Sequence, residues 1–280
     1  MNNYEEEIEL TFPSQLDVIK SSVMKQASLL KKVAHVYADA IASGGLVHVY
    51  ANGHSRVSVE EMVIRMGALT GFHPILSSAL TTFTDVVGSN GLRVGQFFEK
   101  IEKSGKQLLE EVDFGEKDVL LVVTATGTTT AAVDIALEFT KRYPQLPIVG
   151  LASAIQSQEA PPKHSCGKNL WHIIDEAEKG YFIDNGMPMG DLSTTIDGQT
   201  GTYQVCPLSS IGALTIVQSL NELTIRALDA RGVPHYVLRN MHLKNTIDNY
   251  DNWLRDQRKR YALSMHNPNS VRPQIALLEE

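Results

Sequence analysis

Two neighbouring carboxylates and a histidine stand close together in the stretch NGHSRVSVEE, residues 52–61. Glu60 and Glu61 follow Ser55 by five and six positions, which at helical spacing is about a turn and a half. Because successive helical side chains point about 100° apart, one glutamate can face a ligand at the loop while its neighbour faces away. Carboxylate and imidazole groups transfer protons in enzymes, so Glu61, Glu60 and His54 are the candidate acid–base residues of this stretch.

Each of these residues also has an ordinary structural explanation. Carboxylates near the start of a helix are favoured by the helix dipole. Arg65 lies four positions after Glu61, which is the spacing of an ion pair on a helix surface. The sequence does not decide which glutamate would be the base. A histidine among small residues at a helix start has a stronger claim to a function than a lone histidine elsewhere.

Three stretches of small polar residues precede predicted helices and could hold an anion. The first is residues 51–55, the second is TATGTTT, with five threonines among seven residues, and the third is CPLSS. The start of a helix exposes unpaired N–H groups at the positive end of the dipole, so it can bind an anion without a lysine. Helix capping is the alternative role for the hydroxyls. The candidate binding residues are Asn52, Gly53 and Ser55 in the first stretch, Thr124, Thr126, Gly127, Thr128 and Thr129 in the second, and Ser209 and Ser210 in the third.

Four residues outside these stretches are further candidates. His164, in a connection rich in proline and glycine, and His242, beyond the last predicted strand, are acid–base or binding candidates of second rank. Lys168 could neutralise part of an anion's charge, and Asp191, in DNGMPMGD, could bind a ligand hydroxyl, whereas Asp184 is expected to stabilise its loop. Two aspartates without a nearby histidine are a weak basis for a metal site, so no metal is expected.

The apolar pattern predicts an α/β protein. Helices are expected over 12–42, 57–69, 97–112, 129–143, 209–231 and 245–261, and strands over 46–50, 73–76, 146–153, 181–186 and within 118–127. Residues 156–180 are expected to form a long connection, and 190–202 a short strand or hairpin. Alternating strands and helices predict a three-layer, doubly wound, Rossmann-like parallel sheet, here preceded by a long N-terminal helix. Such sheets bind small ligands at the carboxyl ends of their strands.

Several of these stretches together resemble the SIS (sugar isomerase) domain family. The second turn of that family usually reads Ser-x-Ser-Gly-x-Thr, and in TATGTT, residues 124–129, threonine replaces both serines, so the hydroxyls are retained. The stretches GHSRVSVEEMVIRMG, HSCGKNL, DNGMPMGD and CPLSSIGA are similar, in order and spacing, to a single-domain and largely uncharacterised branch of the family. The resemblance covers roughly residues 12–240.

The resemblance implies a function as well as a fold. SIS loops bind phosphosugars, so the leading hypothesis is cofactor-independent aldose–ketose isomerisation of a sugar phosphate, or of a sulfonated sugar, through an enediol. A SIS-type lyase or etherase and a non-catalytic sugar-phosphate sensor are the alternatives, because fold alone does not set the reaction. SIS enzymes commonly complete their sites with residues from a neighbouring subunit, so His242 and the C-terminal arm could act across a subunit contact. The missing glycines of GxGxxG count against a nucleotide-binding Rossmann enzyme.

Composition and charge set the expectations about location and partners. The chain has 280 residues, of which 43% are hydrophobic and 20% are charged, and its net charge is -7, all within the range of an ordinary globular protein. A negative chain is poorly suited to nucleic acid. The only cysteines, Cys166 and Cys206, form no CxxC pair, which favours a reducing compartment over a zinc or disulfide framework. The acidic start and the lack of a long apolar run predict a cytoplasmic protein without a membrane span.

We expect one large domain with helical additions. These are an N-terminal helical extension over 1–44, a SIS-type α/β domain over 45–240, and a C-terminal helix and arm over 241–280 that could contact a neighbouring subunit. The apolar stripes of the helices over 12–42 and 209–231 are expected to exceed what one domain covers, which predicts a homodimer or a dimer of dimers. The expected ligand is a small anionic sugar, and no cofactor is expected.

Overall fold

A parallel five-stranded sheet forms the centre of the protein. The computed structural model describes residues 10–80, 87–243 and 250–271. The strands are buried along much of their length, as expected of a sheet with both faces covered. They are β1 (Val47–Ala51), β2 (Phe72–Ile75), β3 (Val119–Val123), β4 (Ile148–Ala152) and β5 (Gly180–Asp184), in the order β2-β1-β3-β4-β5.

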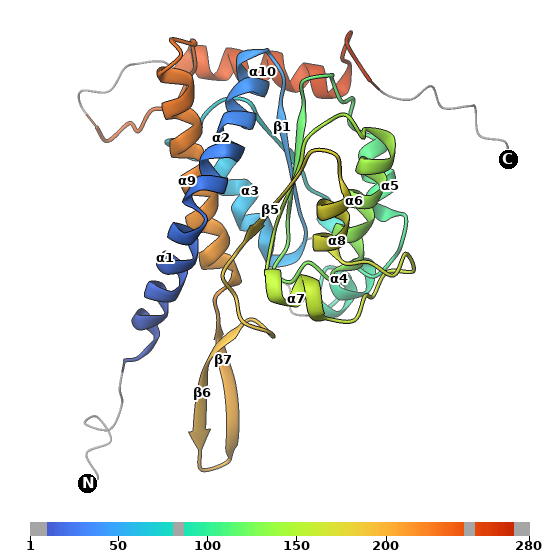
Figure 1. The fold of residues 1–280 in the computed structure, drawn as a ribbon, viewed down its shortest axis with the longest axis vertical. Coiled ribbons are helices and arrows are strands. Elements are labelled where there is room, and N and C mark those ends of the chain that lie inside the picture. The colour runs from blue at the N-terminus through green and yellow to red at the C-terminus, as the bar shows by residue number, and fades with distance from the viewer. Residues whose placement is uncertain (1–9, 81–86, 244–249, 272–280) are drawn as a thin grey trace, which may run out of the picture.

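Helices cover both faces of this sheet (Figure 1). Alternate residues of each strand point to opposite faces, so Val49 and Leu121 pack in one core whereas Tyr50 and Leu120 pack in the other. The predicted three-layer, doubly wound α/β fold is therefore confirmed. The first face carries α1 (Gln15–Lys25), α2 (Ala27–Ala42), α3 (Arg56–Val63) and α9 (Ser209–Asp229), and the second carries α5 (Ser104–Glu110), α6 (Thr130–Arg142) and α8 (Leu170–Glu176).

The remaining elements lie at the two ends of the strands (Figure 1). α10 (Tyr250–Met265) crosses the end at which the strands begin, where Trp253 Nε1 donates to the Ala68 carbonyl at 3.1 Å and Arg260 Nη1 donates to the Gly45 carbonyl at 2.8 Å. The opposite end, where the strands finish, is the lower end of the figure. There lie α4 (Leu92–Phe98), α7 (Ala154–Glu159) and a projecting antiparallel hairpin of β6 (Leu192–Gly198) and β7 (Gly201–Pro207).

The long N-terminal helix predicted over 12–42 is divided into two helices. A single 3-10 turn precedes α1, and α1 and α2 are separated at Gln26, which has φ of -99 and ψ of 10. The Gln26 side chain pairs with the backbone of Asp184, because Nε2 donates to the Asp184 carbonyl at 2.8 Å and Oε1 accepts from the Asp184 N–H at 2.8 Å. A contact with the end of β5 thus replaces the helical continuation that the apolar pattern predicted.

Two further predicted segments differ from the structure. The helix expected over 97–112 is interrupted between α4 and α5, and the break contains Glu99 and ends at Lys103, whose φ is 70. The connection expected over 156–180 contains α8 and most of α7. The first difference bears on the site, because the break brings the Glu99 carboxylate to the ends of the strands.

Several other predictions can be compared directly. The short strand or hairpin expected over 190–202 is a hairpin that extends to Pro207, and Val237 forms an isolated bridge with Leu69. The first residues of the helix expected over 245–261 and the end of the C-terminal arm lie outside the described residues. No helix in the described part of the chain is long and apolar enough to cross a membrane. The division at residues 44 and 240 stays a prediction.

Candidate functional site

The candidate site lies where the strand order reverses. β1 pairs with β2 on one side and with β3 on the other, so the connections from β1 and β3 leave the sheet in opposite directions. Doubly wound sheets bind small ligands in the crevice at such a point. A cavity of about 350 Å³ lies at the carboxyl ends of these two strands. It is lined by Asn52, Gly53, His54 and Ser55 after β1, by Leu92, Gln96 and Glu99 in and after α4, by Thr124, Ala125, Thr126 and Thr129 after β3, and by Asp191, Pro207 and Ser210 around the hairpin base.

All three hydroxyl-rich stretches therefore contribute to one cavity, although they lie far apart in the sequence. The structure brings together nine of the residues singled out in the sequence, and their roles remain proposals. These nine are Asn52, Gly53, His54, Ser55, Thr124, Thr126, Thr129, Asp191 and Ser210.

The loop after β1 turns sharply into α3. Gly53 has φ of 56, a left-handed conformation that favours glycine, and Gly53–Ser55 form one 3-10 turn that continues into α3 at Arg56. His54 is exposed, whereas Asn52 is only 5% exposed. The Oδ1 atom of Asn52 is buried and has no hydrogen-bond partner among the described residues. Because an unpaired buried acceptor is costly, this oxygen is suited to accept a hydrogen bond from a bound molecule.

The turn after β3 is held in shape from behind. Gly127 has φ of 74, and a Cβ atom at this position would lie 2.4 Å from Ser157 Oγ, so the turn needs glycine here. The Ala125 carbonyl accepts from Ser153 N–H at 3.0 Å and from Asn185 Nδ2 at 2.8 Å. Thr126 Oγ1 and Thr128 Oγ1 are 2.9 Å apart. Gly127 and Thr128, both predicted binding residues, do not line the cavity, and they shape the turn instead.

The third stretch is organised by a carboxylate. Asp191 Oδ1 accepts from the Ser209 N–H at 2.7 Å, and Asp191 Oδ2 accepts from Ser209 Oγ at 2.6 Å. Ser209 begins α9 but does not line the cavity, whereas Ser210 does. Ser209 therefore does not face the cavity of its own chain, because Asp191 takes both its N–H and its hydroxyl, and a role for Ser209 in binding stays a prediction.

Glu99 is the carboxylate that the break between α4 and α5 brings into the cavity. Asn52 Nδ2 donates to Glu99 Oε2 at 3.0 Å, and the Glu99 carbonyl accepts from the N–H of Ala131 in the first turn of α6 at 3.0 Å. Burial raises the pKa of the Glu99 carboxyl above its ordinary value, and the hydrogen bond from Asn52 opposes that rise. A partly buried carboxylate with a raised pKa in a cavity is a typical acid–base residue.

Glu60 and Glu61 do not line the cavity. Glu60 is exposed, and its Oε1 lies 3.8 Å from Arg56 Nε. Glu61 pairs with Arg65 at 3.0 Å and accepts a hydrogen bond from Gln218 Nε2 at 2.8 Å. Both side chains are thus engaged on the outer surface of α3, and a role for either one in proton transfer stays a prediction.

Three other candidates also lie away from the cavity. His164 is buried, and its Nε2 lies 3.3 Å from Asp134 Oδ1, so it ties its connection to α6. Lys168 pairs with Glu176. His242 is exposed and follows the segment that bridges to Leu69, before β2, so it lies toward the end at which the strands begin. The structure therefore does not bring these three residues to the candidate site within one chain.

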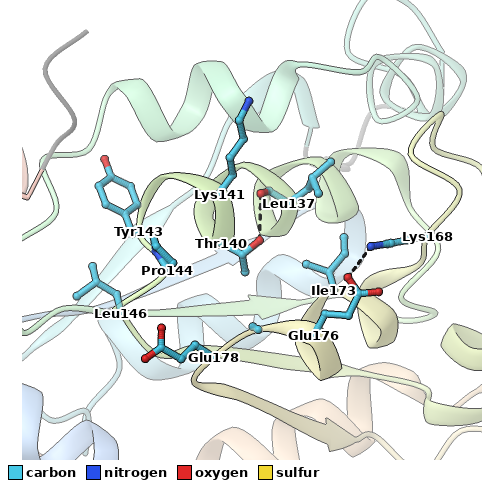
Figure 2. A pocket seen from close by; sticks show the side chains of 11 residues that line it. Leu137, Thr140, Lys141, Tyr143, Pro144, Leu146, Lys168, Ile173, Glu176 and Glu178 are labelled. Atoms are coloured by element: carbon cyan, nitrogen blue, oxygen red, sulfur yellow. Dashed lines mark hydrogen bonds and ion pairs between the residues drawn. The ribbon is translucent and has the colours of Figure 1, made fainter.

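A second and larger hollow lies between α6 and α8, and Figure 2 shows its lining. Its volume is about 440 Å³, its floor is largely apolar, and Lys168 and Glu176 pair at its rim (Figure 2). Only Lys168 among the predicted site residues lines it. We place the candidate site in the smaller cavity, because that cavity lies at the reversal of strand order and contains the carboxylate with the raised pKa. The described residues contain no group of three or more His, Cys, Asp and Glu side chains that could hold a metal ion.

Five cavity residues were not singled out in the sequence: Leu92, Gln96, Glu99, Ala125 and Pro207. Glu99 is the most important of these for acid–base chemistry. The sequence predicts one continuous helix over 97–112, and in such a helix Glu99 would be an ordinary surface residue. Gly105 was the available signal against one continuous helix, since glycine in a helix interior is unfavourable. Its Cα lies so close to α6 that a Cβ atom would be 2.3 Å from the Ile135 nitrogen.

The sheet order and the cavity at its reversal define a doubly wound α/β protein with a candidate small-ligand site. The SIS domain family model matches residues 12–153, and the chain belongs to the SIS domain family. The resemblance noted in the sequence is therefore confirmed.

The chain is also similar to UPF0309 proteins and, in fold, to a solved isomerase structure. It is 26% identical over 216 residues to the UPF0309 protein BH0227 of Halalkalibacterium halodurans, which covers 77% of this chain and 80% of the relative. It is 28% identical over 207 residues to the UPF0309 protein BH3325 of the same organism, covering 74% of this chain and 79% of the relative. The structure of phosphoheptose isomerase GmhA from Neisseria gonorrhoeae aligns with a TM-score of 0.46 and 7% identity over 76% of this chain and 94% of that one.

Proposed function

We propose that this protein binds a phosphosugar, or a related anionic sugar such as a sulfonated one, in the cavity between β1 and β3. Membership of the SIS domain family supports this proposal. So does the cavity itself, which gathers hydroxyl groups beside the starts of α3 and α6, where helix N–H groups favour an anion. No lysine or arginine is among the described residues that line it, so hydroxyls and N–H groups would hold the anion.

The proposed reaction is aldose–ketose isomerisation with Glu99 as the base. The observation that carries it is a carboxylate inside the cavity, fixed by Asn52, whose pKa burial raises. In the proposed reaction Glu99 removes a proton from the hydroxyl-bearing carbon beside the carbonyl while the carbonyl oxygen takes up a proton, which gives an enediol. The other enediol oxygen then gives up its proton as the new carbonyl forms, and Glu99 delivers a proton, which can exchange with solvent in between, to the former carbonyl carbon. A raised pKa strengthens the carboxylate as a base near neutral pH. His54, exposed at the cavity, is the candidate that protonates the ring oxygen when the sugar opens.

Deuterium exchange tests this reaction directly. The protein is incubated in D₂O with five- to seven-carbon sugar phosphates and their monosulfonated analogues. An enediol reaction places deuterium on the carbon beside the carbonyl, which NMR detects. Glu99→Gln keeps the size of the side chain and should lower the exchange rate by about 10² to 10⁴, the usual contribution of a general base.

Glu60→Gln and Glu61→Gln are the matched controls, because both remove a carboxylate that lies outside the cavity. We expect exchange to persist in both. Loss of exchange in Glu61→Gln or Glu60→Gln, with Glu99→Gln active, would return the base to the residues predicted from the sequence.

The same ligands, tested for binding as well as for exchange and turnover, separate the alternatives. Ligand binding without exchange or turnover favours a sugar-phosphate sensor. Cleavage products without an isomerised sugar favour a SIS-type lyase or etherase. Failure of every anionic sugar to bind rejects the proposed function altogether.

A homodimer or dimer of dimers is part of the proposal. α2 and α9 pack against one another, which covers much of the apolar surface behind that prediction. Exposed apolar side chains remain on α1, where Leu16 is 45%, Val18 is 50% and Met24 is 65% exposed. Light scattering on the full chain measures the assembly, and a monomer would remove any role of His242 across a subunit contact.

A further inference from the structure

Asp191 occupies the start of the 21-residue helix α9. Its Oδ1 accepts from the N–H groups of Ser209 at 2.7 Å and Leu208 at 3.2 Å, and its Oδ2 accepts from Ser209 Oγ at 2.6 Å. Asp191 does this with φ of 65, in the left-handed region that residues with side chains rarely adopt. The positive end of α9 is thus neutralised by a carboxylate of the protein itself. An anion of the ligand has no free place there.

The cavity therefore differs in charge from one side to the other. The starts of α3 and α6, with Ser55, Thr126 and Thr129, favour an anion. Asp191 and Glu99 contribute carboxylates elsewhere in the wall, and no lysine or arginine is among the described lining residues. The positive charges of Lys163 and Lys100 act on the Glu99 carboxyl from outside the lining. A ligand group with a second negative charge would lie against one of these carboxylates, and such like-charge contacts weaken binding strongly.

Asn52 gives an independent indication of what the ligand presents. It is 5% exposed, and its Nδ2 is used by Glu99 at 3.0 Å while its Oδ1 has no partner among the described residues. An amide oxygen accepts hydrogen bonds and cannot donate them. Together with the carboxylates of Glu99 and Asp191, it gives this part of the cavity an accepting character. The complementary ligand carries donors, which in a sugar are hydroxyl or ammonium groups.

We propose that Asp191 is a specificity-determining residue that makes the site accept sugars with one anionic group and reject sugars with a second anionic group at the other end. This inference rests on the proposed function, because it concerns ligands of the same cavity. The ligand class is thereby narrowed to monophosphates or monosulfonates whose other end carries hydroxyl or amino groups. Sugar bisphosphates and phosphorylated sugar acids are excluded.

Matched pairs of ligands test the proposal on the unmodified protein. Fructose 6-phosphate is compared with fructose 1,6-bisphosphate, and glucose 6-phosphate with 6-phosphogluconate; ribose 5-phosphate and sedoheptulose 7-phosphate are compared with their bisphosphates. Dissociation constants are measured by calorimetry at low and at high salt. We expect at least one monophosphate to bind at least about tenfold more tightly than its doubly anionic counterpart. The ratio of the two dissociation constants, doubly anionic ligand over monophosphate, should shrink in high salt, because salt screens charge repulsion.

Asp191→Asn then tests the residue itself. Asparagine keeps the shape and an oxygen that can accept from the Ser209 N–H, but it removes the charge. The ratio should fall toward one in this variant. Ser209→Ala is the matched control, since it removes one bond to Asp191 and keeps the carboxylate, so the ratio should persist.

The possible outcomes separate this inference from the proposed function. Equal or tighter binding of the doubly anionic ligands to the unmodified protein overturns the inference and leaves the proposed function standing. Binding of no sugar phosphate at all rejects both. A ratio unchanged in a folded Asp191→Asn variant shows that another residue sets the specificity.

Discussion

Polar side chains gather at both ends of the sheet, but the two groups are built differently. Where β1 and β2 begin, a chain of contacts joins Asp118, His48, His73 and Ser264 and ends on α10. Where β1 and β3 finish, the polar groups line a cavity that is open to solvent. The first group fastens elements together, whereas the second leaves an acceptor free for another molecule.

In the group at the beginning of the strands, the side chains are bonded to one another. His48 Nε2 lies 3.1 Å from Asp118 Oδ2, and His48 Nδ1 lies 3.1 Å from His73 Nδ1. His73 Nε2 lies 3.0 Å from Ser264 Oγ, on α10. Asp118 also accepts from the Leu46 N–H at 2.7 Å and from the Gly115 N–H at 2.8 Å. Every side chain of this group is joined to at least one other, which is what a structural network requires.

Burial and a shifted pKa do not by themselves mark a functional residue in this protein. Burial lowers the pKa of His73 to about 3 and raises that of Glu99, so both groups contain a titratable side chain with a shifted pKa. The difference lies in what surrounds them. The partners of His73 are held by a strand, β1, and a helix, α10, whereas Glu99 faces a cavity beside the unpartnered oxygen of Asn52.

Glu99→Gln is expected to have the largest effect, and it tests whether Glu99 is a functional or a structural residue. Glu99→Gln should lower turnover by about 10² to 10⁴, yet the variant should be at least as stable as the unmodified protein at pH 7. A carboxyl whose pKa is raised on folding contributes stability at low pH that is lost as pH rises, so removing its charge costs the fold nothing at neutral pH. Turnover and urea unfolding measured on the same preparations check this. A strongly destabilised Glu99→Gln protein would make Glu99 a structural residue like Asp118.

Asp118→Ala should give the opposite result. It removes the acceptor for two backbone N–H groups and leaves His48 buried without its carboxylate. Leaving a buried hydrogen-bond donor without its acceptor typically costs about 1–3 kcal/mol. We expect a loss of this size in the free energy of unfolding, measured in urea, with kcat retained by the fraction that is folded. Loss of kcat in fully folded protein would contradict a purely structural role.

Acid should lower the stability of the group where the strands begin, because the pKa of His73 is lower in the folded protein than in the unfolded chain. Its folded pKa of about 3 is depressed by burial first, then by repulsion from His48, with Asp118 opposing. An unfolded histidine titrates near pH 6.5, so the stability that His73 contributes is present above that pH and is lost as pH falls toward 3. The loss approaches about 1.4 kcal/mol per pH unit. Unfolding at pH 5, 6 and 7 measures it, and His73→Gln should remove most of this slope, whereas an equal slope in the variant would place it elsewhere.

The sequence predicted the parts of the site that depend on local chemistry. Hydroxyl-rich turns after buried apolar strands predicted the two loops at β1 and β3, because strand ends and helix starts are local features. Glu99 could not be found in this way. Its place depends on a break that tertiary contacts impose, including the close approach of Gly105 to α6 and the acceptance of an α6 N–H by the Glu99 carbonyl.

Two other differences between the sequence predictions and the structure have the same physical cause. Ser209 has the residue type and position of an anion-binding serine, but only the folded chain brings Asp191, 18 residues earlier, onto it. Gln26 has no property that ends a helix, and it is its pairing with the backbone of Asp184 that divides α1 from α2. In each case a contact distant in sequence competes with a local preference, and the distant contact wins.

The smallest effect is expected for Arg65→Ala, at a residue that belongs to neither group. Glu61 and Arg65 form an exposed ion pair four residues apart on α3, and the Arg65 side chain is 64% exposed. Such pairs contribute about 0.3–0.5 kcal/mol, so Arg65→Ala should lower the free energy of unfolding by no more than that and should leave the rate of deuterium exchange unchanged. Urea unfolding and the exchange assay measure the two effects. A large loss of exchange with unchanged stability would mean that Glu61 needs Arg65 to act on the ligand. Since Glu61 lies outside the cavity of its own chain, it would then have to act in the cavity of a second copy.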